Sequence, residues 1–232
     1  RIQNLLSAHS QRPDLKAFHD RCRSHVGYPD GLRHQRDFLH VFERNGFIKT
    51  LNVWAFENIC ATLKEHHEQT QTRLRVHVRL SSIMLSDGNF PELVTSIMQA
   101  YGVEPGEICF GVSETAFSRG VENVLPTLKL LANLGISIIV TDVGVDFACI
   151  RYLDKLPLSA IRLNTGYIAE AIKTSKGKLI LRTIFAMGHD LNLQVIADGV
   201  RDKEIVGSLV AWGCNSVCGP YYGSEMPLVF LL

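Results

Sequence analysis

Short runs rich in β-branched residues alternate with longer amphipathic runs from about residue 70 to the end of the chain. Residues 73–80 alternate polar and apolar positions, which predicts a strand, and residues 91–101 then place apolar side chains at helical spacing. The same order recurs at 107–112 with 121–134, 137–141 with 147–153, 160–163 with 167–191, and 193–197 with 203–212, before a short strand at 216–218. Strands that alternate with helices in this way pair in parallel through right-handed crossovers.

The N-terminal part of the chain carries a weaker form of the same pattern. Residues 37–42 and 51–64 look helical, and residues 5–8 and 17–20 fit two more short strands. Eight β units favour an α/β fold of the TIM-like (β/α)8 barrel type, and an open doubly wound sheet is the alternative. We expect one domain over residues 1–232, because no linker or low-complexity tract interrupts the alternation. The chain does not begin with methionine, which indicates an excised part of a longer protein.

Composition excludes several classes of protein. Of 232 residues, 46% are hydrophobic and 20% are charged, so the chain is neither disordered nor fibrous. With 24 Lys and Arg against 23 Asp and Glu, it has no electrostatic signature of nucleic-acid binding, and we expect no DNA partner. Six cysteines without paired C-x-x-C spacing favour a reducing, cytoplasmic setting. No apolar run approaches the roughly 18 residues of a membrane span, which leaves open whether a longer parent protein is tethered to a membrane.

Chemistry in either parallel architecture belongs at the C-terminal ends of the strands. The residues predicted there are Arg79, Gly111, Glu114, Thr141, Asp142, Arg162, Asn164, Asp198, Arg201 and Cys218. A metal-dependent hydrolase needs several carboxylates or imidazoles at this place, since a divalent cation takes about six oxygen ligands. Arginine has no lone pair to offer a metal and repels it. The predicted strand ends are therefore poor in metal ligands and rich in fixed positive charge.

Seven segments follow the motifs of one family in order and in spacing. They are VRLS (78–81), GVSE (111–114), TDVG (141–144), RYLDKLP (151–157), IRLN (161–164), ADGVRDKE (197–204) and CGPYYG (218–223). On these segments the chain resembles the EAL domains, (β/α)8 barrels that hydrolyse the bacterial second messenger cyclic di-GMP. The family motifs read roughly NLS, E-x-T-E, DDFG, YLKRLP, LKID, AEGVE and QGY. The resemblance covers about residues 32–228, with a helical segment at 35–43, and implies a barrel that works in bacterial signalling.

The chain departs from the family at most of the positions that carry chemistry. The resemblance implies that the Asn of NLS, the first Glu of E-x-T-E and the first Asp of DDFG are metal ligands, and that a lysine orients the attacking water and the phosphate. The corresponding positions hold Arg79, Gly111 and Thr141 for the ligands, Arg162 for the lysine, Asp198 and Arg201 for the carboxylates of AEGVE, and Cys218 for the late glutamine. Three metal ligands of the family are therefore replaced.

The Glu-Ala-Leu signature of the family should lie near residues 18–24. If Arg23 matches the arginine that follows the signature, His19 replaces the ligand glutamate, whereas an ungapped count from Phe38 places Asp20 there. Both alignments remain open, and neither contains the motif. The signature is displaced or lost in either alignment.

These substitutions predict a domain without catalytic activity. Family members use two Mg²⁺ or Mn²⁺ ions to activate water and to clamp the phosphodiester. A guanidinium about 4 Å from such a cation costs on the order of 4 kcal/mol at an effective dielectric constant near 20. We therefore expect no catalytic residue, no metal and no other cofactor. Glu114 matches the second glutamate of E-x-T-E, and the resemblance implies that this residue anchors a loop rather than a metal.

Three interpretations of the charged residues at the strand ends stay open. In the first, Arg79 and Arg162 form ion pairs with Asp142 and Asp198 in place of the metals. In the second, a receptor grips cyclic di-GMP without metal, because guanidinium binds phosphate bidentately. Its candidate ligand-binding residues are Arg23, Arg79, Asp142, Arg162 and Asp198. In the third, Asp142, Asp198 and His19 hold one metal and retain residual phosphodiesterase activity.

A loop at residues 143–150 is more apolar than its counterpart in the family, which reads FGTGYSSL. The residues Val145, Phe147, Ala148, Cys149 and Ile150 make it so. An exposed apolar loop on a barrel rim is typical of a contact surface, which makes a homodimer possible. Because substitutions affect nearly every site position, we favour a regulatory or protein-interaction module whose partner is another protein or a fused signalling domain, with cyclic di-GMP as a possible ligand.

Overall fold

The computed structural model describes residues 2–7, 21–28, 31–34, 47–118, 120–201, 203–221 and 225–227. Its strands are β1 (Ile2–Ser7), β2 (Arg21–Tyr28), β3 (Gly31–His34), β4 (Val76–Leu80), β5 (Ile108–Ser113), β6 (Ser137–Val143), β7 (Ala160–Leu163), β8 (Gln194–Ala197), β9 (Ser216–Val217) and β10 (Glu225–Pro227). The α-helices are α2 (Ile48–Thr70), α3 (Ser82–Leu85), α4 (Phe90–Tyr101), α5 (Leu125–Asn133), α6 (Thr165–Ala171), α7 (Ser175–Asp190) and α8 (Lys203–Ala211). Short 3-10 helices η1, η2 and η3 cover Pro105–Glu107, Glu114–Phe117 and Ile150–Tyr152.

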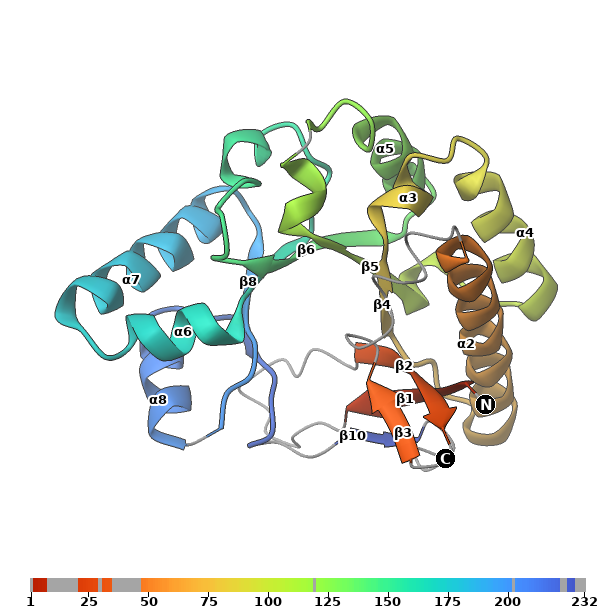
Figure 1. Ribbon diagram of the computed structural model, residues 1–232, viewed down its shortest axis with the longest axis horizontal. Coiled ribbons are helices and arrows are strands. Elements are labelled where there is room, and N and C mark those ends of the chain that lie inside the picture. The colour runs from red at the N-terminus through yellow and green to blue at the C-terminus, as the bar shows by residue number, and fades with distance from the viewer. Residues whose placement is uncertain are drawn as a thin grey trace.

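All ten strands belong to one sheet in the order β10-β1-β2-β4-β5-β6-β7-β8-β9, with β3 beside β2. The strands from β2 through β4 to β9 pair in parallel along this path. The sheet curves so that the longer helices lie outside it (Figure 1). This is the TIM-like α/β architecture that the alternation predicts. Within the described residues, no strand pairing joins β9 back to β1 or β2.

The N-terminal strands differ from the prediction. Strand β1 overlaps the predicted strand at 5–8, but it runs antiparallel to β2 and to β10. The predicted strand at 17–20 and the predicted helix at 37–42 lie outside the described residues. Strands β3 and β10 are short, pair in antiparallel fashion with β2 and β1, and were not predicted from the sequence pattern.

Two of the predicted helices are different in the structure. The single helix expected over 167–191 is split into α6 and α7, because Thr174 adopts extended backbone angles and accepts a hydrogen bond from the backbone N–H of Gly177 at 3.0 Å. That side chain caps α7 and ends any continuous helix before it. The helix expected over 147–153 is reduced to the single turn η3.

The main hydrophobic core lies between the sheet and the surrounding helices. The alternate residues of β4 and β5 that enter it are Val76, Val78, Leu80, Ile108, Phe110 and Val112, all buried. Phe110 contacts Phe56 of α2 and Phe90 of α4, with ring centroids 5.5 and 6.0 Å apart. One aromatic ring of the sheet therefore fixes two helices, and burying such a side chain contributes about 1.5–3 kcal/mol.

A smaller core lies on the inner side of the strands. It consists of Cys109, Ile139, Ala160, Ile196 and Cys218, one residue from each of five neighbouring parts of the sheet. These positions alternate with the residues of the main core, as the period of two in a strand requires. The inner side of the strands is therefore filled with small and medium-sized side chains below the strand ends.

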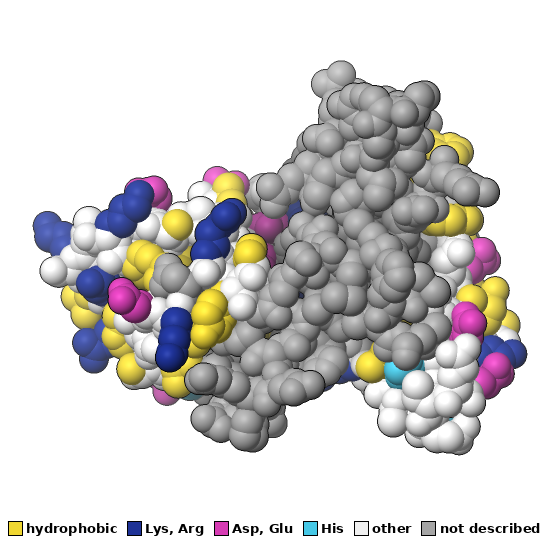
Figure 2. Space-filling view, turned by 90° about the horizontal axis from the view of Figure 1, so that it is seen from below, with side chains coloured by type: hydrophobic (Ala, Val, Ile, Leu, Met, Phe, Trp, Pro, Cys, Tyr) yellow, Lys and Arg dark blue, Asp and Glu magenta, His cyan; other side chains and the backbone are white. Residues whose placement is uncertain are grey.

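In the view from below, Lys and Arg side chains gather at the left, on the side of α6, α7 and α8, with Asp and Glu side chains among them (Figure 2). None of the described helices is both long and apolar enough to cross a bilayer.

Candidate functional site

The predicted site lies where the parallel strands end. Arg79 near the end of β4 donates a hydrogen bond from its guanidinium to the Asp142 carboxylate at the end of β6, with Nη2 and Oδ2 2.7 Å apart. The hydroxyl of Thr141 donates to the same oxygen at 3.2 Å. The side chains of Arg79 and Asp142 are 35% and 22% exposed, so the pair is partly open to solvent. The structure therefore contains the first of the two ion pairs expected from the sequence.

A β-bulge presents Asp142 to Arg79. Val140 is level with Ile161, yet Val143 is level with Leu163, so β6 has one residue more than β7 between these two pairs. Thr141 and Asp142 thus lie opposite Arg162 alone. Asp142 adopts a left-handed backbone conformation with φ of 61°, which aspartate tolerates better than most residues. A bulge of this kind turns side chains away from their regular alternation, and here it turns a carboxylate toward a neighbouring guanidinium.

The position of the family's glutamate ligand on β5 is filled from the neighbouring strand. Gly111 has no side chain, and a Cβ added there would lie 1.9 Å from Nε2 of His77. His77 belongs to β4, is 1% exposed and lies two residues before Arg79 on the same side of the strand. The imidazole therefore occupies the volume through which any side chain at position 111 would have to pass.

Sequence reasoning missed His77, although a signal was present. In VHVRL, the period of two places His77 and Arg79 on the face opposite to the three apolar residues, which lie in the main core. That pattern assigns His77 to the inside of the barrel. The contact with Gly111 also depends on the alignment of two strands, which the sequence alone does not give.

Glu114 holds the loop that follows β6. Its carboxylate accepts hydrogen bonds from the backbone N–H groups of Gly144 at 2.8 Å and Ala148 at 2.6 Å, and the side chain is fully buried. Within the same loop, burial and then the nearby Glu114 charge raise the pKa of the Cys149 thiol to about 12. The thiol therefore stays protonated at neutral pH, and this part of the loop is a packed structural unit.

Arg162 lies deeper than Arg79. It is 2% exposed, the largest fully buried side chain in the described residues, on the inner side of β7. Burial raises the pKa of the nearby Cys109 thiol to about 11, although the positive charges of Arg75 and Arg162 oppose that rise. Arg162 is therefore buried, whereas Arg79, which is likewise the penultimate residue of its strand, is partly open to solvent.

The remaining predicted residues lie on other strands. Asp198 follows β8, is partly buried, and its Oδ1 accepts a hydrogen bond from the backbone N–H of Gly199 at 2.9 Å. Arg201 is exposed, and Cys218 is buried beside β9. Arg23 lies on β2, directly after Cys22, which is level with Val78 of β4. The two candidates for the displaced glutamate, His19 and Asp20, lie outside the described residues.

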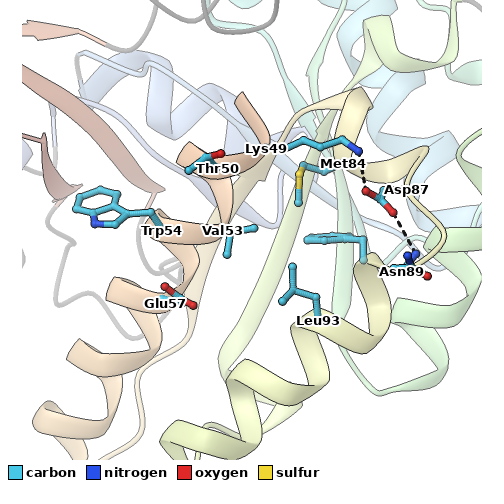
Figure 3. A pocket seen from close by; sticks show the side chains of 10 residues that line it. Lys49, Thr50, Val53, Trp54, Glu57, Met84, Asp87, Asn89 and Leu93 are labelled. Atoms are coloured by element: carbon cyan, nitrogen blue, oxygen red, sulfur yellow. Dashed lines mark hydrogen bonds and ion pairs between the residues drawn. The ribbon is translucent and has the colours of Figure 1, made fainter. Parts of the chain in front are cut away.

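A separate cavity lies on the outer side of the barrel, and part of its lining comes from the segment that follows β4. It has a volume of about 680 Å³ and lies between α2 and α4 (Figure 3). Its lining is Lys49, Thr50, Val53, Trp54, Glu57, Met84, Asp87, Asn89, Phe90 and Leu93. At one end Lys49 and Asp87 form an ion pair at 2.7 Å. That pair keeps the pKa of the Asp87 carboxyl below its ordinary value, first through the hydrogen bond from Lys49.

A family model described as EAL domain matches residues 19–225. The chain belongs to the EAL domain family. Two curated relatives of this EAL domain are the bifunctional diguanylate cyclase/cyclic di-GMP phosphodiesterase MucR of Pseudomonas aeruginosa and the oxygen sensor protein DosP of Escherichia coli. The first is 27% identical over 202 residues and the second is 24% identical over 213 residues. These alignments cover 87% and 92% of this chain but only 30% and 26% of the relatives, so the chain spans less than a third of each.

Solved structures show the same fold. A structure described as PaMucR phosphodiesterase in complex with c-di-GMP has a TM-score of 0.91 at 24% identity, covering 100% of this chain and 94% of that one. The FimX EAL domain of Pseudomonas aeruginosa, described as bound to c-di-GMP, has a TM-score of 0.85 at 18% identity, covering 97% and 90%. The fold predicted from the order of the elements is thereby confirmed.

Proposed function

We propose that this EAL domain does not hydrolyse cyclic di-GMP and instead acts as a regulatory or protein-interaction module in bacterial signalling. The observation that carries the proposal is the ion pair between Arg79 and Asp142 at 2.7 Å. It engages a surviving carboxylate at the mouth with a guanidinium that stands where the family has a metal-binding asparagine. The positive charge of Arg79 offsets the negative charge of the Asp142 carboxylate, so this carboxylate attracts a metal ion less strongly.

The residues at the mouth do not fit the Mg²⁺ or Mn²⁺ ions of the family. Arg79 offers no lone pair, and its fixed charge repels a cation. The described residues bring no group of three or more His, Cys, Asp and Glu side chains together as a metal site would require. Gly111 supplies no ligand atom, and the His77 ring closes the space beside it. Several independent features therefore support the loss of the metal centre.

A metal-independent cyclic di-GMP receptor is the second candidate. It is favoured by the partial exposure of Arg79 and by the c-di-GMP complexes named for the MucR and FimX structures. Against it, Arg79 is already bound to Asp142, and the buried Arg162 is not presented at the surface. A phosphate would have to displace one carboxylate and reach a second guanidinium inside the barrel. We therefore place the interaction module first and residual phosphodiesterase activity last.

Two measurements test this order. In a hydrolysis assay with added Mn²⁺, run beside an active EAL phosphodiesterase, we expect no linear dinucleotide from this protein. Product that accumulates in proportion to enzyme would refute the inactive assignment. In titration calorimetry with cyclic di-GMP, with and without Mg²⁺, we expect no binding tighter than a Kd of about 10 μM, which corresponds to about 6.8 kcal/mol. Tighter binding without Mg²⁺ would establish the receptor instead.

The loop after β6 supports the proposed protein contact. Val145 and Ile150 are 56% and 39% exposed, whereas Phe147 packs edge-on against Tyr167 of α6 with ring centroids 5.2 Å apart. The anchored loop thus holds two aliphatic side chains toward solvent. We propose that this surface forms a homodimer or contacts a fused signalling domain. If the protein sediments as a monomer both at micromolar and at high concentration, the homodimer is excluded.

The cytoplasmic location stays a prediction.

A further inference from the structure

The solvent-facing side of α7 exposes two aliphatic side chains. Its inward face packs into the main core through Leu181, Ile184 and Phe185. On the outward side, Leu179 is 62% exposed and the adjacent Ile180 is 51% exposed. Two neighbouring aliphatic side chains in water forgo the free energy that burial would provide. Nothing in the described chain covers them.

Three cations lie in the same stretch of α7 as these aliphatic side chains. Lys176, Lys178 and Arg182 are all exposed, and none forms an ion pair within the described part of the chain. Lys176 and Arg182 are three residues before and after Leu179, so both flank it on the same helical face. The first turn of α7 contains no acidic residue, although negative charge is preferred there. The helix therefore tolerates a local excess of positive charge that its own neighbours do not offset.

Exposed cations on the other described helices either have an acidic partner or stand alone, as Lys129 does on α5. The whole chain has a net charge of only +1. On α2, Lys49 is paired with Asp87 at 2.7 Å, and Lys64 is within 3.9 Å of Glu68. Helix α7 lies at the left edge of the molecule in Figure 1, and the left side of Figure 2, which includes α6, α7 and α8, shows Lys and Arg side chains among hydrophobic and acidic ones. Among the described residues, α7 thus carries three such cations with two exposed aliphatic residues, whereas α5 carries one cation, Lys129, beside Leu130.

We propose that the outward face of α7 binds the surface of an anionic lipid membrane. Leu179 and Ile180 would enter the boundary between headgroups and acyl chains, while the three cations meet lipid phosphates. Charge complementarity selects an anionic surface. Placement of the aliphatic residues on a convex helix at the edge of the molecule suits a flat bilayer better than a protein partner, which would have to provide a groove around them.

Vesicle cosedimentation tests the proposal with the intact chain. We expect wild-type protein to bind vesicles of phosphatidylcholine with phosphatidylglycerol, to bind pure phosphatidylcholine much less, and to dissociate at high salt. Lys178→Gln should weaken binding about fivefold, and Lys176→Gln with Lys178→Gln about 30-fold, as expected from the loss of one or two surface charges. Leu179→Ser should weaken binding several-fold without changing the salt dependence.

Matched variants separate this surface from general charge and hydrophobicity. Lys64→Gln removes one exposed cation from α2, and Leu130→Ser removes one aliphatic side chain that is 51% exposed on α5. Both should bind like wild type, with unchanged circular dichroism in all variants. Absence of wild-type binding, or equal losses in the matched variants, would overturn the proposal. Binding to soluble polyglutamate without binding to vesicles would overturn it too, and would indicate an acidic protein partner.

Discussion

The two sides of the same strands follow different chemistry. Toward the helices, β4 and β5 present only hydrocarbon, as Val78 and Phe110 illustrate. Toward the interior, the same strands present His77 and Arg79, and β7 adds the buried Arg162. The helix-facing side forms the main hydrophobic core of the fold. The inner side carries the positions at which this chain differs from the family motifs, so a substitution there can change the chemistry of the site without disturbing the core on the other side of the same strand.

The helix-facing side should be the more costly to disturb. Phe110→Ala removes the ring that joins α2 and α4, and we expect the free energy of unfolding to fall by about 3–5 kcal/mol in urea denaturation. The exposed Leu130 is the control, and Leu130→Ala should change stability by less than about 1 kcal/mol. A loss below about 1 kcal/mol for Phe110→Ala would contradict the division between the two sides.

Glu114 sharpens the comparison, because it is a buried charge with a structural role. Glu114→Ala leaves two backbone N–H groups without their acceptor, and we expect a loss of about 3 kcal/mol. Hydrogen exchange should speed up selectively at Gly144 and Ala148. Glu114→Gln, which keeps one acceptor oxygen, should lose less. Unchanged protection of both amides in Glu114→Ala would show that other contacts hold the loop.

The contact between His77 and Gly111 can be measured as a coupling. Gly111→Ala places a methyl group against the imidazole, and we expect a cost of about 1–3 kcal/mol. In the His77→Ala background, where the ring is absent, Gly111→Ala should reduce the free energy of unfolding by less than it does in the wild type. Additive effects of the two substitutions in a double-mutant cycle would mean that the ring does not occupy this volume.

The ion pair at the mouth should contribute least to stability. Asp142→Asn removes the negative charge beside Arg79, and we expect a loss of at most about 1 kcal/mol, because both side chains are partly exposed. High salt should reduce the difference between wild type and variant. A loss of several kcal/mol would indicate that the pair is part of the folding core.

Much of the fold could be predicted, because hydrophobic period and element order are local properties. The strands β4 to β8 and helix α4 lie close to the predicted ranges. The direction of β1 could not be predicted, since it depends on which neighbour the strand meets in space. The break between α6 and α7 had a visible signal in Thr174 and Gly177, but the apolar period continues across it.

The site was less predictable than the fold. The parallel order placed Arg79 and Asp142 at the same end of the sheet, and that was enough to anticipate their contact. It could not reveal that Arg162 is buried, since depth depends on how the barrel closes around the side chain. The second expected pair, between Arg162 and Asp198, stays a prediction.

The additional residue in β6 has a consequence for the strand as a whole. Val140 and Val143 both face the helices, although residues three apart in a regular strand point to opposite sides. Because of the additional residue, Val143 again faces the helices, as Val140 does, although Asp142 between them does not follow the regular alternation. Anyone who grafts this mouth onto another barrel must transfer that residue too. Without it, the side chain of Val143 would point into the barrel, and the Asp142 carboxylate would no longer reach Arg79.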